Sequence, residues 1–452
     1  MTSNLTTNLK RFWRSVIREP YTGDRRSRLR VVMNNLILHI HPAQVPTRAL
    51  RFTYTWGLGG LSALLVVLLA VTGSMLLFHY TPSPDAAYNS ILALQTDVWF
   101  GALVRNLHHW AGNLLLVVAF LHLLRVFFTG AFRPPREFNW LLGISLLLLV
   151  VVSNFTGYLL PWDQLAYWGI TVGISILSYI PVAGAWISRL LLGGPEIGAA
   201  TLLNFYALHI AVIPMAMLFI MSYHFWRVRK DGFSIPRTVA EPPVERVEKS
   251  MTMTDLVRPE AVMATVAIAA LTIWSMAVAA PLEPLANPAV SPNPAKAPWY
   301  FMGIQELLLH FHPLVGAIIL PAVVLFVLAA LPYLDTDMDA VGIYFRSRRG
   351  RWLSLFSFLW GVLITLIYVI VDEFFLDWAA LFPGLPSLIA NGLVPFALLW
   401  LGIIGYFELT RRATRATRCE AILATFVLML AGFITLTVVG VFFRGPGMAL
   451  IY

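Results

Sequence analysis

Four histidines stand inside two apolar segments of the sequence at nearly the same spacing. His108 and His122 are 14 residues apart in the segment RNLHHWAGNLLLVVAFLHLLR, and His209 and His224 are 15 residues apart in a later segment. At about 100° per residue, the members of each pair lie within about 60° of each other on one face of a helix and about 21–23 Å apart along it. Each of these two segments therefore offers one imidazole near each of its ends.

The chemistry that suits this pattern is metal coordination by paired imidazoles. Ionisable groups inside an apolar span usually serve a function, and neutral imidazole is a common metal ligand. Zinc would need a third or fourth ligand, whereas neither segment contains a Cys, Asp or Glu. A planar macrocycle with two axial histidines fits these donors, which predicts two non-covalent haems b, each six-coordinate and suited to electron transfer. The alternative is that the histidines only form hydrogen bonds with neighbouring helices.

Four glycines in two further apolar segments repeat the histidine interval. Gly59 and Gly73 are 14 residues apart, and so are Gly143 and Gly157. A flat cofactor between helices requires the backbone to approach closely at both levels, and glycine permits that approach. Ordinary packing of small residues explains either pair alone, but it does not explain why both pairs share the interval of the histidines.

Two arginines flank the first histidine pair. Arg105 precedes His108 by three residues, and Arg125 follows His122 by three. Each guanidinium is placed to pair with the propionates of a haem at its own membrane face. The alternative is that these cations only extend towards the lipid headgroups.

The segments that carry these residues belong to an integral membrane protein. The chain has 452 residues, of which 58% are hydrophobic and 12% charged, and its mean hydropathy is +0.74. Apolar runs of about 20 residues recur throughout, which is typical of membrane helices and not of a membrane β-barrel. We expect an all-α polytopic transmembrane helical bundle of about nine spans, with an N-terminal four-helix bundle that holds the two haems. The expected spans are 57–79, 100–127, 140–160, 201–226, 261–281, 314–333, 352–371, 386–407 and 419–442.

Basic residues predict how this bundle sits in the membrane. Of the 32 Lys and Arg residues, 28 fall in the N-terminal segment and in every second connection. The positive-inside rule then places the N-terminus in the cytoplasm and the C-terminus on the other face of a bacterial-type inner (cell) membrane. The net charge of +9 therefore reflects topology, with anionic lipids as secondary partners, rather than nucleic-acid binding.

The start of the chain and its single cysteine narrow the possibilities further. The polar, basic N-terminal segment does not resemble a signal peptide, and residues 28–41 are expected to form an amphipathic helix on the membrane surface. Because Cys419 is the only cysteine, the sequence has no CxxCH site for a covalent haem and no cysteine set for an iron–sulfur cluster.

Three stretches of the sequence resemble cytochrome b of the cytochrome bc complexes, the quinol:cytochrome c oxidoreductases. They are RNLHHWAGNLLLVVAFLHLLRVFFTG (105–130), GYLLPWDQLAYWG (157–169) and TLLNFYALHIAVIPMAMLFIMSYHFWRVRKDGFS (201–234). The histidine intervals look most like those of the photosynthetic, plastoquinol-oxidising branch of this family. The stretch PLEPLANPAVSPNPAKAPWYF (281–301) resembles a loop that this branch carries on a separate subunit, so the two parts are joined here in one chain.

The resemblance implies a protein that moves electrons between quinones and haems. His108 and His209 would hold the iron of an outer haem (bL), and His122 and His224 the iron of an inner haem (bH). Quinol would be oxidised at an outer site, with one electron passing to a Rieske iron–sulfur protein and the other through haem bL to haem bH. Quinone would be reduced at an inner site, and proton uptake inside and release outside would translocate protons. A c-type cytochrome subunit as a partner and a homodimer of the complex are implied by the resemblance alone.

The chain divides into five parts on this basis. They are a basic cytoplasmic N-terminal segment (1–56), a four-helix di-haem domain (57–235), a cytoplasmic linker (236–260), two helices with a loop that complete the quinol site (261–335), and three further C-terminal transmembrane helices (336–452).

Aromatic and proline residues are concentrated in the two outer loops, 157–169 and 281–313. A stiff, amphipathic pocket at headgroup depth suits a quinone ring, although an ordinary belt of interfacial aromatic residues explains the same composition. On the cytoplasmic side, polar residues that follow His224 could bind a quinone oxygen and relay protons, although the positive-inside rule alone explains the cations among them. The residues expected at the outer site are Tyr158, Pro161, Trp162, Trp299 and Tyr300, and those expected at the inner site are Arg229, Lys230 and Asp231.

The sequence departs from the family at the outer site. Relatives usually have Pro-Glu-Trp-Tyr where this chain has APWY at 297–300, so the glutamate often assigned to removal of the quinol proton is replaced by Pro298. A quinol proton still needs an acceptor. Glu306, six residues after Tyr300, is the nearest acid, and we expect Glu306, with Tyr300, to supply this function from a short helix.

Four other positions carry weaker expectations. Gly57 occupies the position of a cysteine that tethers an extra c-type haem in the photosynthetic branch, so no covalent haem c is expected. His79, His310 and His312 fall in outer loops, where we expect interfacial polar residues or contacts with the Rieske protein.

Two other functions remain compatible with parts of the pattern. A di-haem cytochrome b anchor of a dehydrogenase or hydrogenase would also hold two haems and reduce quinone, but it usually has fewer spans and lacks the PWDQ and PWY loops. A proton-coupled transporter could use the histidines as a relay and would bind no haem.

Overall fold

The computed structural model of this chain describes residues 42, 44–238, 249–251, 255–335 and 337–451. Within these residues nine helices are long and apolar enough to cross a membrane, which confirms the expected all-α bundle. The amphipathic helix expected near the N-terminus and part of the expected linker lie outside the described residues. The nine spans are Leu58–Leu77, Gly101–Phe128, Glu137–Tyr158, Ala199–Asp231, Val257–Ala277, Leu314–Leu334, Arg348–Phe374, Ile389–Ala413 and Arg418–Phe442.

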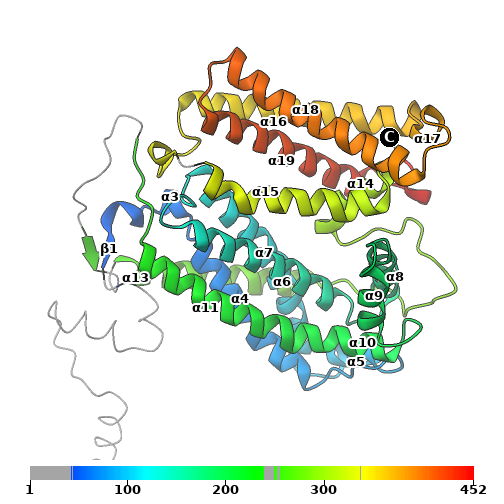
Figure 1. Cartoon of the computed structure of the whole chain (residues 1–452). Coiled ribbons are helices and arrows are strands. Elements are labelled where there is room, and N and C mark those ends of the chain that lie inside the picture. Colours follow the sequence, from blue (N-terminus) through cyan, green and yellow to red (C-terminus); the bar gives the residue numbers. More distant parts are fainter. Residues whose placement is uncertain (1–41, 43, 239–248, 252–254, 336, 452) are drawn as a thin grey trace, which may run out of the picture.

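The helices form two groups that lie against each other (Figure 1). The first half of the molecule contains α4 (Leu58–Leu77), α6 (Gly101–Phe128), α7 (Glu137–Tyr158), the continuous α10 (Ala199–Ala207), η3 (Leu208–Val212) and α11 (Ile213–Asp231), and α13 (Val257–Ala277). The second half contains α14 (Met302–His310), η5 (Leu314–Ile319), α15 (Leu320–Leu334), α16 (Arg348–Phe374), η7 (Ile389–Leu393), α18 (Val394–Ala413) and α19 (Arg418–Phe442).

Short elements mark the two ends of the bundle. One end, on the right in Figure 1, holds α5 (Ala87–Thr96), α8 (Gln164–Ser178), α9 (Gly184–Leu192) and α17 (Trp378–Leu381). The other end holds α3 (Phe52–Thr55) and the antiparallel pair of β1 (Gln44–Pro46) and β2 (Lys249–Met251), in which Val45 faces Ser250. The arginine-rich connections fall at this second end, so we name it the inner end and the first the outer end. The described residues also form the 3₁₀ turns η2 (Thr47–Leu50), η4 (Trp299–Phe301), η6 (Met338–Ala340) and η8 (Pro446–Met448).

Three spans contain a π-helical turn, and a proline follows each turn. Pro214, Pro321 and Pro395 stand at the second position of the α-helix that continues the span after η3, η5 and η7. Proline has no N–H to donate, and its ring clashes with the carbonyl group four residues earlier. The α-helical hydrogen-bond pattern therefore cannot run through these positions, and a wider turn takes its place.

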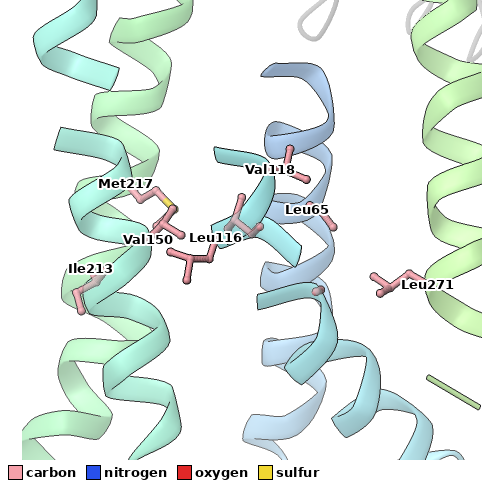
Figure 2. Close-up of a cluster of buried hydrophobic side chains, with 9 residues drawn as sticks. Leu65, Leu116, Val118, Val150, Ile213, Met217 and Leu271 are labelled. Carbon is pink, nitrogen blue, oxygen red and sulfur yellow. The ribbon is translucent and has the colours of Figure 1, made fainter. Parts of the chain in front are cut away.

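An apolar layer fills the middle of the first half. Figure 2 shows Leu116 of α6 pointing towards Val150 of α7 and Met217 of α11, and Leu65 of α4 belongs to the same buried cluster. Each of these residues stands near the midpoint of one of the histidine or glycine intervals. The layer therefore separates an outer level, which holds one member of each pair, from an inner level, which holds the other.

Helix α19 is the centre of the second half. It is the most buried of the nine described spans, with 44% of its apolar window buried. Gly361 of α16 lets the two backbones approach closely, since a Cβ atom there would lie 2.6 Å from the carbonyl oxygen of Leu428. The last span is thus placed to carry the residues that follow it towards α14 and α16.

Candidate functional site

His108 of α6 and His209 of η3 face each other at the outer level. Their ring centroids are 6.2 Å apart, and the ring planes are inclined by 80°. A metal ion bonded to one nitrogen of each ring at about 2 Å would hold the opposed centroids about 6 Å apart, so the spacing fits one metal ion between the rings. At the inner level, His122 of α6 and His224 of α11 lie close enough to interact electrostatically.

The outer glycines lie directly against the outer histidines. A Cβ atom added at Gly157 would lie 2.6 Å from Cε1 of His209, and one added at Gly73 would lie 3.0 Å from Cε1 of His108. Real Cβ atoms essentially never come within 3.0 Å of another heavy atom. Any larger residue at Gly157 would therefore push the imidazole out of its place.

The inner glycines have the same relation to the inner histidines, with more room. A Cβ atom at Gly59 would lie 3.2 Å from Cε1 of His122, and one at Gly143 would lie 3.7 Å from Cε1 of His224. Four glycines from α4 and α7 thus meet four histidines from the other two long helices, one to one. This close approach of backbone to imidazole is what a flat group between the helices requires, and we name Gly59, Gly73, Gly143 and Gly157 the cradle glycines.

Two threonines fix the orientation of the outer imidazoles. The Thr72 hydroxyl donates to the carbonyl oxygen of Leu68 and lies 2.9 Å from Nδ1 of His108, so this hydroxyl is placed to accept the Nδ1 proton. Nδ1 of His209 lies 3.1 Å from the carbonyl oxygen of Ser153, which can only accept, and 3.2 Å from the Thr156 hydroxyl. In both rings a protonated Nδ1 leaves the Nε2 lone pair for a metal ion.

Sequence reasoning missed these threonines, although a signal for them exists. Thr72 and Thr156 each come immediately before a cradle glycine, in the dipeptide TG, whereas the inner glycines follow leucines. At the inner level Nδ1 of His224 is buried and has no hydroxyl partner among the described residues; the backbone of Asn139 is the polar group near it. The two levels therefore offer different surroundings to chemically identical ligand pairs.

The rest of the donor set also suits a group that needs only two protein ligands per metal ion. Among the described residues, no group of three or more His, Cys, Asp or Glu side chains is arranged to hold a metal ion. Two imidazoles at each level would hold the iron of a haem, whose porphyrin supplies the other ligands.

Both flanking arginines bind protein groups in this structure. Arg105 is buried, and its guanidinium donates to the carbonyl oxygens of Ala280 and Pro281 at 2.9 and 2.6 Å, which ties α6 to the loop after α13. Arg125 donates from Nε to the carbonyl oxygen of Tyr54 at 2.9 Å and stacks over its ring. Contacts with haem propionates remain a prediction for both side chains.

Hydrogen bonds tie the two outer loops to each other and to the first half. Asp163 caps α8 by accepting from the backbone N–H of Ala166 at 2.9 Å, and its other oxygen accepts from the backbone N–H of Glu283 at 3.1 Å. Trp299 donates from Nε1 to Oδ1 of Asn113 on α6 at 2.7 Å. The loop after α13 is therefore held over the outer level of the four long helices.

The residues expected at the outer quinone site differ in what they contact and in how far they are buried. Tyr158 and Tyr300 lie close together, and Tyr300 packs against the apolar layer of the first half. The Tyr300 hydroxyl is buried with no hydrogen-bond partner in the described part of the chain, and burial raises its pKa. Trp162, next to Pro161, is buried in an outer cluster against which Tyr158 also packs, whereas Trp299 is 43% exposed.

Glu306 lies on the expected short helix, α14, but faces the second half of the molecule. Its carboxylate accepts hydrogen bonds of 2.9–3.2 Å from Nε and Nη2 of Arg444, which follows α19, and both side chains are fully buried. Gly440 of α19 makes room for it, since a Cβ atom there would lie 3.2 Å from Cγ of Glu306. Its role as a proton acceptor stays a prediction.

The residues expected at the inner quinone site form the end of α11. Asp231 pairs with Arg227 at 2.8 Å, and the ammonium group of Lys230 lies 4.9 Å from the Trp226 ring centroid. Arg229 is half-buried beside them. Their function in quinone binding stays a prediction.

The expectation that His310 is an interfacial loop residue is wrong. The side chain is buried at the end of α14, where Nδ1 lies 2.6 Å from Oδ2 of Asp372 and Nε2 lies 3.8 Å from Oε2 of Glu306. The sequence contains a signal for this cluster. Asp372 and Glu373 are adjacent acids at the end of an apolar span, and Arg444 is a lone cation after the last span.

Comparisons with known proteins identify relatives of the first half and of the whole fold. The family model described as cytochrome b/b6/petB matches residues 45–232. Cytochrome b6 of Heliobacterium mobile is 42% identical over 196 residues, which cover 43% of this chain and 90% of that protein. The menaquinol:cytochrome c reductase cytochrome b subunit of Geobacillus thermodenitrificans is 41% identical over 199 residues, which cover 44% of this chain and 87% of that protein. A solved chain described as hyperthermophilic respiratory Complex III shares the fold, with a TM-score of 0.62, 21% identity and coverage of 91% of this chain and 96% of that chain.

Proposed function

The chain belongs to the cytochrome b/b6 family, and on this premise we propose that it is the di-haem cytochrome b subunit of a quinol:cytochrome c oxidoreductase. The observation that carries the proposal is the one-to-one pairing of four histidines with four glycines at two levels of one bundle. The relative named as a subunit of a menaquinol:cytochrome c reductase supports the class of reaction.

Four imidazoles would hold the two haems without a covalent link. His108 and His209 would bind the iron of the outer haem, bL, and His122 and His224 the iron of the inner haem, bH. Each haem supplies a one-electron carrier when bound. The protein orients the outer rings through Nδ1, leaves room for a flat group at the glycines, and keeps water out of the space between the two levels with its apolar layer.

Quinol oxidation at the outer end releases two electrons and two protons. One electron leaves to a Rieske iron–sulfur protein and then to a c-type cytochrome subunit, and the other crosses to the inner end, where quinone is reduced. Protons are taken up inside and released outside, in a bacterial-type inner membrane with the N-terminus in the cytoplasm. The complex is proposed to be a homodimer in contact with anionic lipids.

The outer quinone site is proposed to lie between the two outer loops. Tyr158, Pro161, Trp162, Trp299 and Tyr300 come from loops that hydrogen bonds hold together, and the unpartnered Tyr300 hydroxyl is available to a quinol oxygen. Glu306 is proposed to act after Tyr300 in proton removal. At the inner end, the terminus of α11 supplies cations and a carboxylate for quinone binding, namely Arg229, Lys230 and Asp231.

A redox titration of the purified complex, followed through the haem α-bands, tests this proposal. We expect two haems b per chain that titrate as two separate components. In Gly157→Ala the added Cβ atom displaces His209, so the outer component should be lost while the inner one remains. Gly194→Ala is the matched control, because no heavy atom lies within 4 Å of a Cβ atom there. A wild-type protein without b-type α-bands contradicts the proposal and favours a transporter.

A further inference from the structure

Five ionisable side chains meet at the outer end of the second half. Arg444 donates to Glu306 and to Glu373, each at 2.9 Å. His310 contacts Asp372 through Nδ1 at 2.6 Å, and its Nε2 lies 3.8 Å from the Glu306 carboxylate. These side chains come from α14, from α16 and from the segment after α19. We name Glu306, His310, Asp372, Glu373 and Arg444 the outer ionisable cluster.

The cluster runs from the interior of the protein to its surface. The side chains of Glu306 and His310 are no more than 1% exposed, whereas that of Asp372 is 10% exposed and that of Glu373 is 24% exposed. Trp378 donates to the second oxygen of Asp372 at 3.1 Å, which holds this carboxylate at the mouth of the path. The solvent exposure of these proton-accepting side chains therefore increases from Glu306 and His310 to the acids at the surface.

Helix α14 links the cluster to the proposed outer quinone site. Tyr300 lies in the turn η4 immediately before the helix, with its buried hydroxyl unpartnered among the described residues. Glu306 follows six residues later, about 9 Å along the chain at the helical rise, and His310 follows one turn after that. The tyrosine of the proposed pocket thus stands just before α14, and the buried residues of the cluster, Glu306 and His310, stand on the last turns of this helix.

His310 lies between two carboxylates. Glu306 faces it from α14, and Asp372 and Tyr368 face it from α16, with the Tyr368 ring centroid 5.4 Å from that of the imidazole. Burial alone would lower the pKa of His310, but the contacts with Asp372 and Glu306 outweigh burial and raise it. Burial would raise the pKa of Glu306, but contacts with His310 and Arg444 hold it below its ordinary value.

We propose that the outer ionisable cluster is a proton relay in which His310 carries protons of quinol oxidation from Glu306 to Asp372 and on to the outer aqueous face. The inference rests on the proposed function, because it needs quinol to be oxidised at the outer site. In one cycle the imidazolium gives its Nδ1 proton to the Asp372 carboxylate, which passes it to water. Glu306 meanwhile accepts a proton released by the quinol. The neutral ring then turns about its Cβ–Cγ bond and takes this proton from Glu306, so each departing proton is replaced and no charge accumulates. The electrons leave by the route already described.

The relay supplies what the APWY sequence lacks. A proton leaving the quinol needs a sequence of acceptors within hydrogen-bond reach of one another. With Pro298 in the usual place of a glutamate, the cluster offers the nearest acid along the chain after Tyr300, and a movement of the His310 ring has to close the 3.8 Å between its Nε2 and Glu306. The competing explanation is that the cluster only fastens α14 to α16 and α19, and this explanation predicts a loss of stability without a specific effect on proton transfer.

The test measures haem reduction by a short-chain naphthoquinol and a short-chain benzoquinol in rapid mixing, as a function of pH, in the purified complex. His310→Gln and Asp372→Asn should each slow haem reduction about 100-fold, the lower end of the contribution of general acid–base groups. His310→Ala should be equally slow, and added imidazole should restore at least about a tenth of the wild-type rate by replacing the missing ring. Asp335→Asn breaks a buried ion pair with Arg133 near the inner end, and it should leave the rate unchanged.

The outcomes separate the relay from the function on which it rests. A wild-type complex whose haems accept electrons from neither quinol contradicts the proposed function. An active wild type together with a His310→Gln variant of normal rate and pH profile overturns the relay alone. A slow His310→Ala variant that imidazole does not accelerate also overturns it and supports a fastening role.

Two further measurements keep the test decisive if the His310 and Asp372 variants do not assemble. Trp378→Phe removes only the hydrogen bond that holds the Asp372 carboxylate at the mouth of the path, and it should still slow haem reduction severalfold. Infrared difference spectra of the wild type during quinol oxidation should contain a band from a transiently protonated carboxyl group. The absence of that band, or an unaltered rate in Trp378→Phe, contradicts the relay.

Discussion

The outer and inner histidines differ in the group that lies next to Nδ1, the ring nitrogen that does not face the proposed metal ion. Nδ1 of His108 lies 2.9 Å from the Thr72 hydroxyl, whereas Nδ1 of His224 has no hydroxyl partner among the described residues and only the backbone of Asn139 near it. A hydrogen bond accepted from Nδ1–H makes the imidazole a stronger electron donor to the metal ion, which favours the oxidised metal. The protein can therefore give different redox potentials to two sites with identical ligands, which an electron path with a direction requires.

This difference predicts the effect of Thr72→Val, which keeps the shape of the side chain and removes the hydroxyl. The outer haem should lose stabilisation of its oxidised form, so its midpoint potential should rise. If the hydrogen bond contributes about 1 kcal/mol, the rise is about 40 mV for a one-electron couple. Thr265→Val is the control, because the Thr265 hydroxyl donates only to the backbone of its own helix. A redox titration in which the outer component is unmoved or falls would refute this account.

At the scale of residues, regular spacing made the ligands predictable and irregular contacts did not. Helix periodicity alone identified His108 and His209 as members of paired sets, and their rings face each other. The partner of Glu306 was not predictable, because Arg444 follows it by 138 residues and no periodic pattern joins the two. His310 was misassigned for the same reason: its closest partner, Asp372, lies on α16, 62 residues further along the chain.

At the scale of elements, the π-helical turn η3 explains why the two histidine pairs have different intervals. His209 lies in this turn, and the turn takes about one residue more than an α-helical turn because its hydrogen bonds join residues five apart. The 15 residues between His209 and His224 therefore cover the rotation that 14 residues cover in α6. Pro214 causes the turn by removing an α-helical hydrogen bond.

Removing the turn together with its extra residue should leave both haem sites in place. Deletion of Val212 with Pro214→Ala converts the span to a regular α-helix with a 14-residue interval, so His209 and His224 should keep their relative orientation. We expect two α-band components in the purified variant. The control deletes Leu218 and keeps Pro214, which retains the turn, rotates His224 by about 100° and should cost one haem. Equal haem loss in both deletions would contradict this explanation.

At the scale of the whole molecule, the sequence predicted the number of spans and the two levels of the first half, but not how the helices of the second half are attached to one another. Hydropathy locates spans because the membrane interior imposes one length and one composition on all of them. The attachment depends on a few buried charges at the outer end, where Arg444 from the end of the last span reaches Glu306 on α14 and Glu373 on α16. The last span thereby connects to the proposed quinone site.

Arg444→Met should therefore destabilise the complex in a pH-dependent manner. The variant leaves Glu306 buried without its guanidinium partner, which costs about 3–5 kcal/mol at neutral pH. Because contacts with His310 and with Arg444 lower the pKa of Glu306, the stabilisation from Arg444 is fully present above the ordinary carboxyl pKa of 4.5 and is lost as pH falls through the lower folded value. The difference in thermal unfolding between variant and wild type should accordingly be largest near pH 7 and shrink below pH 4.5.

Arg346→Met provides the matched comparison for this prediction. Arg346 pairs with Asp337 at 2.9 Å, but both side chains are at least 20% exposed, so its loss should cost no more than about 1 kcal/mol. The double variant Glu306→Gln with Arg444→Met should recover part of the loss, because no unpaired charge then remains buried. If Arg444→Met destabilises the complex equally at every pH, then packing at the end of α19, rather than the ion pair, holds this end to α14 and α16.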